Sequence, residues 1–266
     1  MDLQLFILFA LTFVINLVGS LAYSVRIAGI RTRRIALSFS LFNILVLVSR
    51  TANSFQAPLL AKRVEKNVLT GATGHGITDF RWLLLSASLA TVAGAIFTPS
   101  FQRVFTRAVQ AFAHSRSTVK VMLRALSPMG LAYIARNVVV PAGSNLSRLR
   151  QQRLPLGVLA VNAGATAIWT VGVFASMYAA YLNPNLRATT SNLSSVVNGL
   201  ATILLFTIVD PWLSVVTDDV VQGRSSEAYF RRSVTGLLGS RLAGTVLAQV
   251  LFIPAAALVA AIAARI

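Results

Sequence analysis

Polar side chains inside long apolar runs are the residues of this sequence best suited to chemistry, because they are costly in a membrane and usually face a cavity. One run, 35–56, carries a set of them at spacings of seven, three and three residues: Asn43, Arg50, Asn53 and Gln56. On a helix this spacing places all four on roughly one face. An arginine near a span end can also extend to the lipid headgroups, but the amides beside Arg50 favour a polar cavity.

Asp210 is the acidic residue that lies well inside an apolar run, and Pro211 follows it. Proline removes a backbone N–H and therefore predicts a kink at this point. Asp210 can be the counter-ion of a neighbouring arginine, a group that couples transport to a proton or cation, or a residue close to the inner surface.

Four arginines gather at or near the predicted inner boundary of the membrane: Arg26, Arg103, Arg107 and Arg136. Arg103 and Arg107 share the polar face of an amphipathic segment, 101–112. Because guanidinium groups bind phosphate oxygens in a bidentate fork, these arginines indicate an entry site for a lipid phosphate. Anchoring to anionic lipids is the simpler explanation.

Enzyme chemistry finds little support in the sequence. The chain has no cysteine and only two histidines, His75 and His114, which are predicted on opposite sides of the membrane. It contains neither H-E-x-x-H nor G-x-S-x-G. The glycine-rich stretch 71–76 lacks the Lys-Ser/Thr ending of a phosphate-binding loop. We therefore expect no enzymatic activity, no metal site and no cofactor.

The composition indicates that the helices that position these residues lie in a membrane. Of 266 residues, 56% are hydrophobic and 12% charged, and the mean hydropathy is +0.72. A soluble domain has about 25% charged residues. The net charge of +17 is spread between apolar runs instead of on a solvated domain, so we expect anionic membrane lipids as partners and not nucleic acid.

The apolar runs predict an all-α polytopic membrane protein with one integral membrane domain, 1–266. A span needs about 20 mostly apolar residues. Six are expected, at 3–23, 35–56, 82–98, 155–181, 192–216 and 241–264. A basic segment, 99–154, separates three spans from three, a layout found in internally repeated transporters. Within it, 119–140 could form a seventh span, but its charges and Pro128 favour an interfacial or re-entrant helix pair.

The distribution of basic residues predicts an orientation with the N-terminus outside. In that orientation 17 of the 24 Lys and Arg residues fall on or near the inner side and six outside. The inner loops are then 24–34, 99–154 and 217–240, and Arg241 lies at the start of the sixth span.

Two ladders of small residues predict close helix packing. They are Gly172, Ser176 and Ala180, and then Gly236, Ser240, Gly244 and Ala248. Packing within the chain is the default expectation, and a homodimer through these faces is the alternative.

Two stretches of the chain resemble a known family. They are AYSVRIAGIRTRR at 22–34 and LSFSLFNILVLVSRTANSFQAPLL at 37–60. Together they look like the Amj family, the bacterial lipid II flippases named as an alternate to MurJ. The resemblance implies a multi-pass protein of the bacterial cytoplasmic membrane that moves an undecaprenyl-diphosphate-linked peptidoglycan precursor from the inner to the outer leaflet. It assigns no residue roles.

The residues and the resemblance together predict a flippase for a polyprenyl-diphosphate lipid, with a cationic, amide-lined groove. The inner mouth is expected to hold Arg26, Arg103, Arg107 and Arg136. Along or near the outer half we expect Asn43, Arg50, Asn53 and Gln56. Undecaprenyl phosphate or another polyprenyl-linked glycan remains an alternative substrate. A non-transporting scaffold of cell-envelope synthesis is the alternative from another class.

Overall fold

The computed structural model describes residues 2–71, 76–115, 127–136 and 154–266, and within these ranges it is built of helices without a strand. The helices are α1 (Leu3–Thr32), α2 (Ile35–Leu69), α3 (Gly76–Ser115), α5 (Pro128–Arg136), α7 (Leu156–Leu182), the short η3 (Pro184–Leu186), α8 (Arg187–Leu204), the π-helical turn η4 (Leu205–Val209), α9 (Asp210–Val221) and α10 (Glu227–Ala263). Six helical stretches of the described chain are long and apolar enough to cross a membrane, which confirms the all-α polytopic expectation. The stretch α8–η4–α9 counts as one of them.

Most helices extend beyond the spans predicted from hydropathy. The expected inner loop 24–34 is wrong, because α1 continues as helix to Thr32 and so contains Arg26, and α2 continues to Leu69 instead of ending near 56. The expected loop 217–240 is mostly helix, because α10 starts at Glu227, where the Ser226 side chain accepts a hydrogen bond from the Tyr229 N–H. The amphipathic segment 101–112 is a direct continuation of α3, with Pro99 inside the helix. Hydropathy detects only the apolar part of a helix, so the polar turns at these ends were assigned to loops.

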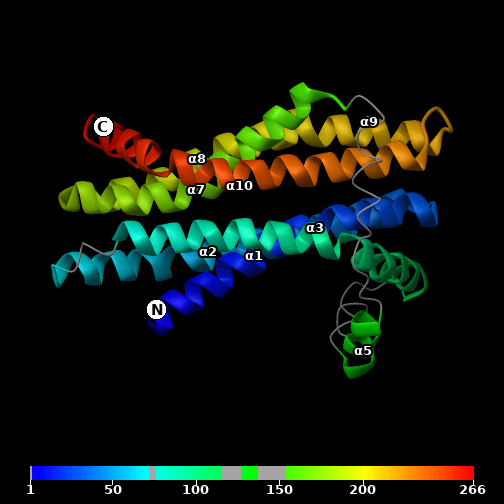
Figure 1. Cartoon of the computed structure of the whole chain (residues 1–266), viewed down its shortest axis with the longest axis horizontal. Coiled ribbons are helices and arrows are strands. Elements are labelled where there is room, and N and C mark those ends of the chain that lie inside the picture. The colour runs from blue at the N-terminus through cyan, green and yellow to red at the C-terminus, as the bar shows by residue number, and fades with distance from the viewer. Residues whose placement is uncertain (1, 72–75, 116–126, 137–153) are drawn as a thin grey trace.

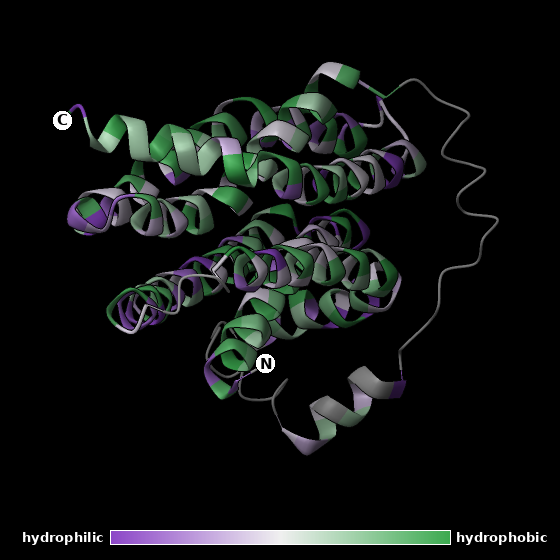
Figure 2. Cartoon of the chain, turned by 60° about the vertical axis from the view of Figure 1, so that its left-hand side comes forward, coloured by the Kyte–Doolittle hydropathy of each residue, from purple (hydrophilic) through white to green (hydrophobic). Residues whose placement is uncertain are grey.

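The segment 119–140 lies mostly outside the described residues. Its described part, α5, has nine residues and therefore a length of about 14 Å, which is too short to span a bilayer. It contacts the end of α3 and lies apart from the main bundle (Figures 1 and 2).

The six long stretches form two halves of three, stacked as two layers in Figure 1. In the first half α1 packs against both α2 and α3, and in the second α7 packs against both α8 and α10. The first helix is thus the central one in each half, which agrees with the predicted division into three spans and three.

The two ends of the bundle differ in their connections and in their basic residues, since Arg31, Arg33, Arg34, Arg103 and Arg107 all lie toward one of them. Both chain termini lie at one end, together with the α2–α3 and α7–α8 connections; we call it the terminus side (Figure 1). The other end, which we call the basic side, holds the α1–α2 and α9–α10 turns, the end of α3 and α5. Apolar residues predominate along the helices of both halves between these ends (Figure 2), and some of them, such as Phe55 and Val250, are exposed.

The halves are joined near the terminus side by aromatic packing. The Phe80 ring of α3 lies 5.7 Å from the Phe252 ring of α10 and 6.1 Å from the Phe174 ring of α7, measured between centroids. Tyr178 of α7 contacts both Phe80 and Phe252. This aromatic cluster and the α3–α10 contact hold the first half against the second.

The small-residue ladders pack inside the chain. A Cβ added at Gly172 would lie 2.6 Å from Asn198 of α8, and one at Gly244 would lie 2.4 Å from the carbonyl oxygen of Ala163 in α7. Ser176 and Ala248 are buried. Because these faces are already covered within the chain, a homodimer would need another surface.

Candidate functional site

A polar cavity of about 90 Å³ lies between the two halves. Both halves line it: α1 and α2 from the first, and α7, η4, α9 and α10 from the second. The side chains that matter for its chemistry are Tyr23, Arg50, Trp169, Phe206, Asp210 and Arg241. At 1.5 Å per residue, Arg50 is about 22 Å from the start of α2 and Arg241 about 21 Å from the start of α10. The cavity therefore lies at the depth of the hydrocarbon core.

Arg26 and Asp210 form an ion pair at the edge of this cavity. Arg26 Nη2 lies 3.1 Å from Asp210 Oδ1, and the Arg26 side chain is only 4% exposed. Its guanidinium carbon also lies 4.4 Å from the centre of the Phe42 ring and 5.0 Å from that of Phe39. The Nε atom of Arg26 is buried without a hydrogen-bond partner among the described residues. Arg26 thus keeps one donor unused even though it is paired.

Arg50 connects the halves through aromatic contacts. It extends from α2, and its guanidinium carbon lies 5.6 Å from the Trp169 ring of α7 and 5.0 Å from the Phe206 ring of η4. Contacts of this kind stabilise a cation without neutralising its charge. The described residues contain no carboxylate within ion-pair distance of Arg50, so its donors remain available to a ligand.

Arg241 supplies a third guanidinium group. It is partly buried in the interior of α10, and its Nε atom has no hydrogen-bond partner in the described chain. A Cβ at Gly19 of α1 would lie 2.8 Å from Arg241 Nη2. The absence of a side chain at Gly19 is what lets the guanidinium lie over α1 and reach the cavity.

An irregular helix segment positions Asp210. The backbone N–H of Asp210 donates to the Leu205 carbonyl, five residues earlier, which is the bond of a π-helical turn. Pro211 follows directly and has no N–H to donate. Pro211 therefore interrupts the hydrogen-bond ladder within the membrane-spanning stretch.

The charges of the site do not balance. Arg50, Arg241 and Asp210 line the cavity, and Arg26 pairs with Asp210 at its edge, so three guanidinium groups accompany one carboxylate and two positive charges are left over. An arginine at the centre of a span costs about 2.5–3.5 kcal/mol on insertion scales. An anion entering the cavity would offset this cost. The described residues hold no cluster of His, Asp or Glu that could bind a metal ion.

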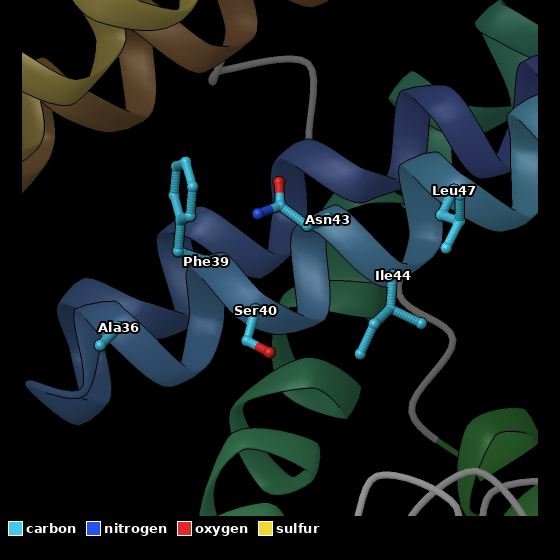
Figure 3. Close-up of a pocket in the computed structure, with 6 residues that line it drawn as sticks. All are labelled: Ala36, Phe39, Ser40, Asn43, Ile44 and Leu47. Carbon is cyan, nitrogen blue, oxygen red and sulfur yellow. The ribbon is translucent and has the colours of Figure 1, made fainter.

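The predicted amides of α2 do not join this cavity. Asn43 is exposed and lines a separate groove on the surface of α2 (Figure 3). Asn53 is half-buried about one turn beyond Arg50. Gln56 is 1% exposed and donates a hydrogen bond to Thr12 Oγ1, which connects α2 to α1.

The remaining predicted arginines lie toward the basic side. Arg103 and Arg107 are both exposed near the end of α3, and Arg107 lies 4.2 Å from the Tyr133 ring of α5. Arg136 is exposed at the end of α5. The structure thus brings Arg26, Arg50 and Asp210 together and leaves these three arginines elsewhere.

Arg241 is the functional candidate that sequence reasoning missed. It borders the last apolar run, so it was counted as an inner-side anchor, although α10 begins 14 residues earlier. The N-cap pattern Ser226-Glu227 was the available signal, because it marks a helix start well before the apolar run.

Taken together, the fold and the site define a polytopic helical membrane protein with a cationic cavity between two three-span halves. Such a cavity suits an anionic substrate that crosses the bilayer. The chain belongs to the Amj family: the family model, described as Alternate to MurJ, matches residues 11–263. It is 34% identical over 257 residues to the lipid II flippase Amj of Bacillus subtilis (strain 168), covering 95% of this chain and 94% of the relative. No solved structure matches the chain.

Proposed function

We propose that this protein is a lipid II flippase of the bacterial cytoplasmic membrane, a transporter and not an enzyme. The observation that carries the proposal is the cavity at membrane depth that Arg50, Arg241 and Asp210 line, with Arg26 paired to Asp210 at its edge. The two excess positive charges match the two negative charges of a lipid-linked diphosphate. The name of the Bacillus subtilis relative agrees with this substrate.

The diphosphate would bind by replacing internal contacts. Arg50 and Arg241 have donors that no described carboxylate uses, and guanidinium groups bind phosphate oxygens through paired N–H donors. Asp210 would act as the internal anion that holds Arg26 in place in the empty protein. A phosphate reaching Arg26 would take over this pairing, which is the coupling role we propose for Asp210.

The size of the cavity implies that the halves must move apart during transport. Sites that enclose a drug-sized ligand have volumes of about 300–1,000 Å³, whereas this cavity has about 90 Å³. It can take phosphate groups, but not the sugar and peptide of the headgroup. The aromatic cluster of Phe80, Phe174, Tyr178 and Phe252 holds the halves together near the terminus side. Opening would therefore start from the basic side.

The predicted residues outside the cavity fit the approach to it. Arg103, Arg107 and Arg136 are exposed toward the basic side, where they can attract anionic headgroups. Asn53 lies just beyond Arg50 and is a candidate contact on the way out. Gln56 would not contact the lipid itself; it would hold α2 against α1 through its hydrogen bond to Thr12.

We further propose that the basic side faces the cytoplasm, as the positive-inside rule predicts. The membrane potential then favours outward movement of an anion, by about 2.3 kcal/mol per charge per 100 mV. Two charges crossing the whole field would gain about 4–5 kcal/mol per 100 mV, which is enough to bias transport without ATP.

The decisive experiment uses purified protein in liposomes with a fluorescent lipid II and a membrane-impermeant quencher outside. Wild-type protein should accelerate exposure of the label relative to empty liposomes. Arg50→Ala should slow this by about tenfold or more, the effect of losing one charged hydrogen bond. The exposed Arg187, on the terminus side and outside the cavity, provides the matched control Arg187→Ala, which should flip at the wild-type rate. No acceleration by folded wild-type protein would exclude a flippase and favour the scaffold alternative.

A further inference from the structure

A second hollow, the α2 groove, lies on the outer surface of α2 and has a volume of about 380 Å³. Its lining residues recur every three or four positions along one stripe of the helix: Ala36, Phe39, Ser40, Asn43, Ile44 and Leu47. Phe39 and Asn43 project along one side of the stripe, and Ser40 and Ile44 along the other (Figure 3). The stripe begins near the basic side and extends for about 17 Å toward the middle of the bundle. Four of its six residues are apolar.

The groove and the cationic cavity share one wall. Phe39 lines the groove, Phe42 lines the cavity, and their rings lie 6.2 Å apart. Arg26 lies against both rings and reaches Asp210 of the cavity. A ligand could therefore have its anionic part at Arg26 and an apolar part in the groove, separated only by this aromatic pair.

We propose that the α2 groove binds the polyprenyl chain of the transported lipid while its diphosphate occupies the cavity. This inference rests on the proposed function and adds a second binding site to it. The chain is attached to the diphosphate and must stay in an apolar environment, so its first isoprene units have to leave the cavity next to the phosphates. The groove is apolar, begins at the wall beside Arg26 and opens outward. The polyprenyl chain in the groove and the diphosphate in the cavity thus belong to one lipid molecule.

The groove also explains why α2 is so little covered. Few of its side chains are buried, and among the exposed ones are Phe39, Leu47 and Val48. Part of this surface would contact bulk lipid in any case. The stripe next to Arg26 is hollowed and adjoins a charged site across the Phe39–Phe42 pair, which favours binding of one specific polyprenyl chain over general contact with bulk lipid.

The test fills the groove without touching the cavity. Asn43 is exposed, so Asn43→Trp should fold, and its ring would occupy the hollow between Phe39 and Leu47. We expect flipping of undecaprenyl-linked lipid II to slow by about tenfold, because a bulky ring displaces apolar chain contacts. A farnesyl-linked analogue, whose short chain needs little of the groove, should be affected far less. Val48→Trp, a similar change at an exposed position next to the groove, should leave both rates at the wild-type level.

A direct measurement complements the rates. Lipid II with a photoreactive group in its polyprenyl chain should crosslink to residues 36–47 of wild-type protein, and less so to Asn43→Trp. If wild-type protein flips lipid II but Asn43→Trp flips both lipids equally well, or the crosslinks map elsewhere, the groove proposal is wrong and the flippase proposal stands. If wild-type protein does not flip, the flippase proposal itself fails. A dimeric wild type that becomes monomeric on Asn43→Trp would identify a second copy of the chain as the occupant and would also overturn the proposal.

Discussion

Arg241 illustrates how a cation can lie inside an apolar bundle without an ion pair to any described residue. Its guanidinium lines the cavity beside the pair formed by Arg26 and Asp210, and its Nε has no hydrogen-bond partner in the described chain. A charge held in this way usually destabilises a fold. The expected compensation comes from a ligand, so Arg241 should matter more for transport than for folding.

This difference can be measured with Arg241→Ala. The flipping rate should fall by about 10- to 100-fold, since a hydrogen bond to a charged group contributes about 1.5–3 kcal/mol. The melting temperature in detergent should stay the same or rise, because an uncompensated charge is removed. Arg231→Ala, on an exposed face of the same helix, should change neither quantity. A large loss of stability with an unchanged flipping rate would assign Arg241 a purely structural role.

Among the elements, the spans could be predicted from the sequence and their ends could not. An apolar run long enough to cross a membrane is almost always a helix, because a helix pairs all the backbone N–H and C=O groups of the run within the run itself. The ends depend on capping and on polar turns that extend into water. Ser226 starts α10 and Asp2 starts α1 through side-chain hydrogen bonds to backbone N–H groups, at 3.1 Å to Tyr229 and 2.8 Å to Leu5.

At the terminus side, Arg63 connects three elements. It donates to Asp2 before α1 and to Asp79 in the first turn of α3, while it belongs to α2 itself. The Arg63 and Asp79 side chains are only 12% and 14% exposed. Hydrogen bonds from the Leu5 N–H and from Arg63 hold the pKa of Asp2 below its ordinary value of 3.8.

Arg63→Met should therefore lower the melting temperature by several degrees, because Asp79 is left as a largely buried, unpaired carboxylate that costs about 1–3 kcal/mol. The exposed pair of Arg187 and Glu65, with about half of each side chain accessible, provides the control. Arg187→Met should have little effect, as expected for a surface ion pair. The Asp2 part of the stabilisation is present above pH 3.8 and is lost as the pH falls through the lowered pKa. Equal melting temperatures for the two variants at neutral pH would contradict this assignment.

At the scale of the whole molecule, the cationic cavity arises only when the two halves come together. Arg26 and Arg50 come from the first half, and Asp210 and Arg241 from the second. Polarity within the predicted spans was enough to select Arg50 and Asp210 from the sequence, whereas Arg26 was selected as an arginine at the inner boundary and lies inside α1 instead. The amides Asn43 and Gln56 were grouped with them because a helical face can be read from spacing, but which neighbour that face meets depends on tertiary packing.

The arrangement of the chain ends yields a test of orientation. Because the chain has no cysteine, each introduced cysteine is unique. Thr70→Cys on the terminus side should react with a membrane-impermeant maleimide in intact cells. Gln222→Cys, in the α9–α10 turn on the basic side, should react only after permeabilisation. Both positions are exposed, so a reversed pattern would mean that the basic side faces outward and that the membrane potential opposes the proposed direction.

The close approach of Gly19 to Arg241 also constrains how the sequence can vary. A side chain at position 19 would displace the guanidinium from this position, because its Cβ would lie 2.8 Å from Nη2. Relatives that keep an arginine in this pose should therefore keep glycine at the facing position, and relatives that lose the arginine are free to fill the gap. The residues at positions 19 and 241 should therefore covary among relatives, so that the first and last helices change together at this contact.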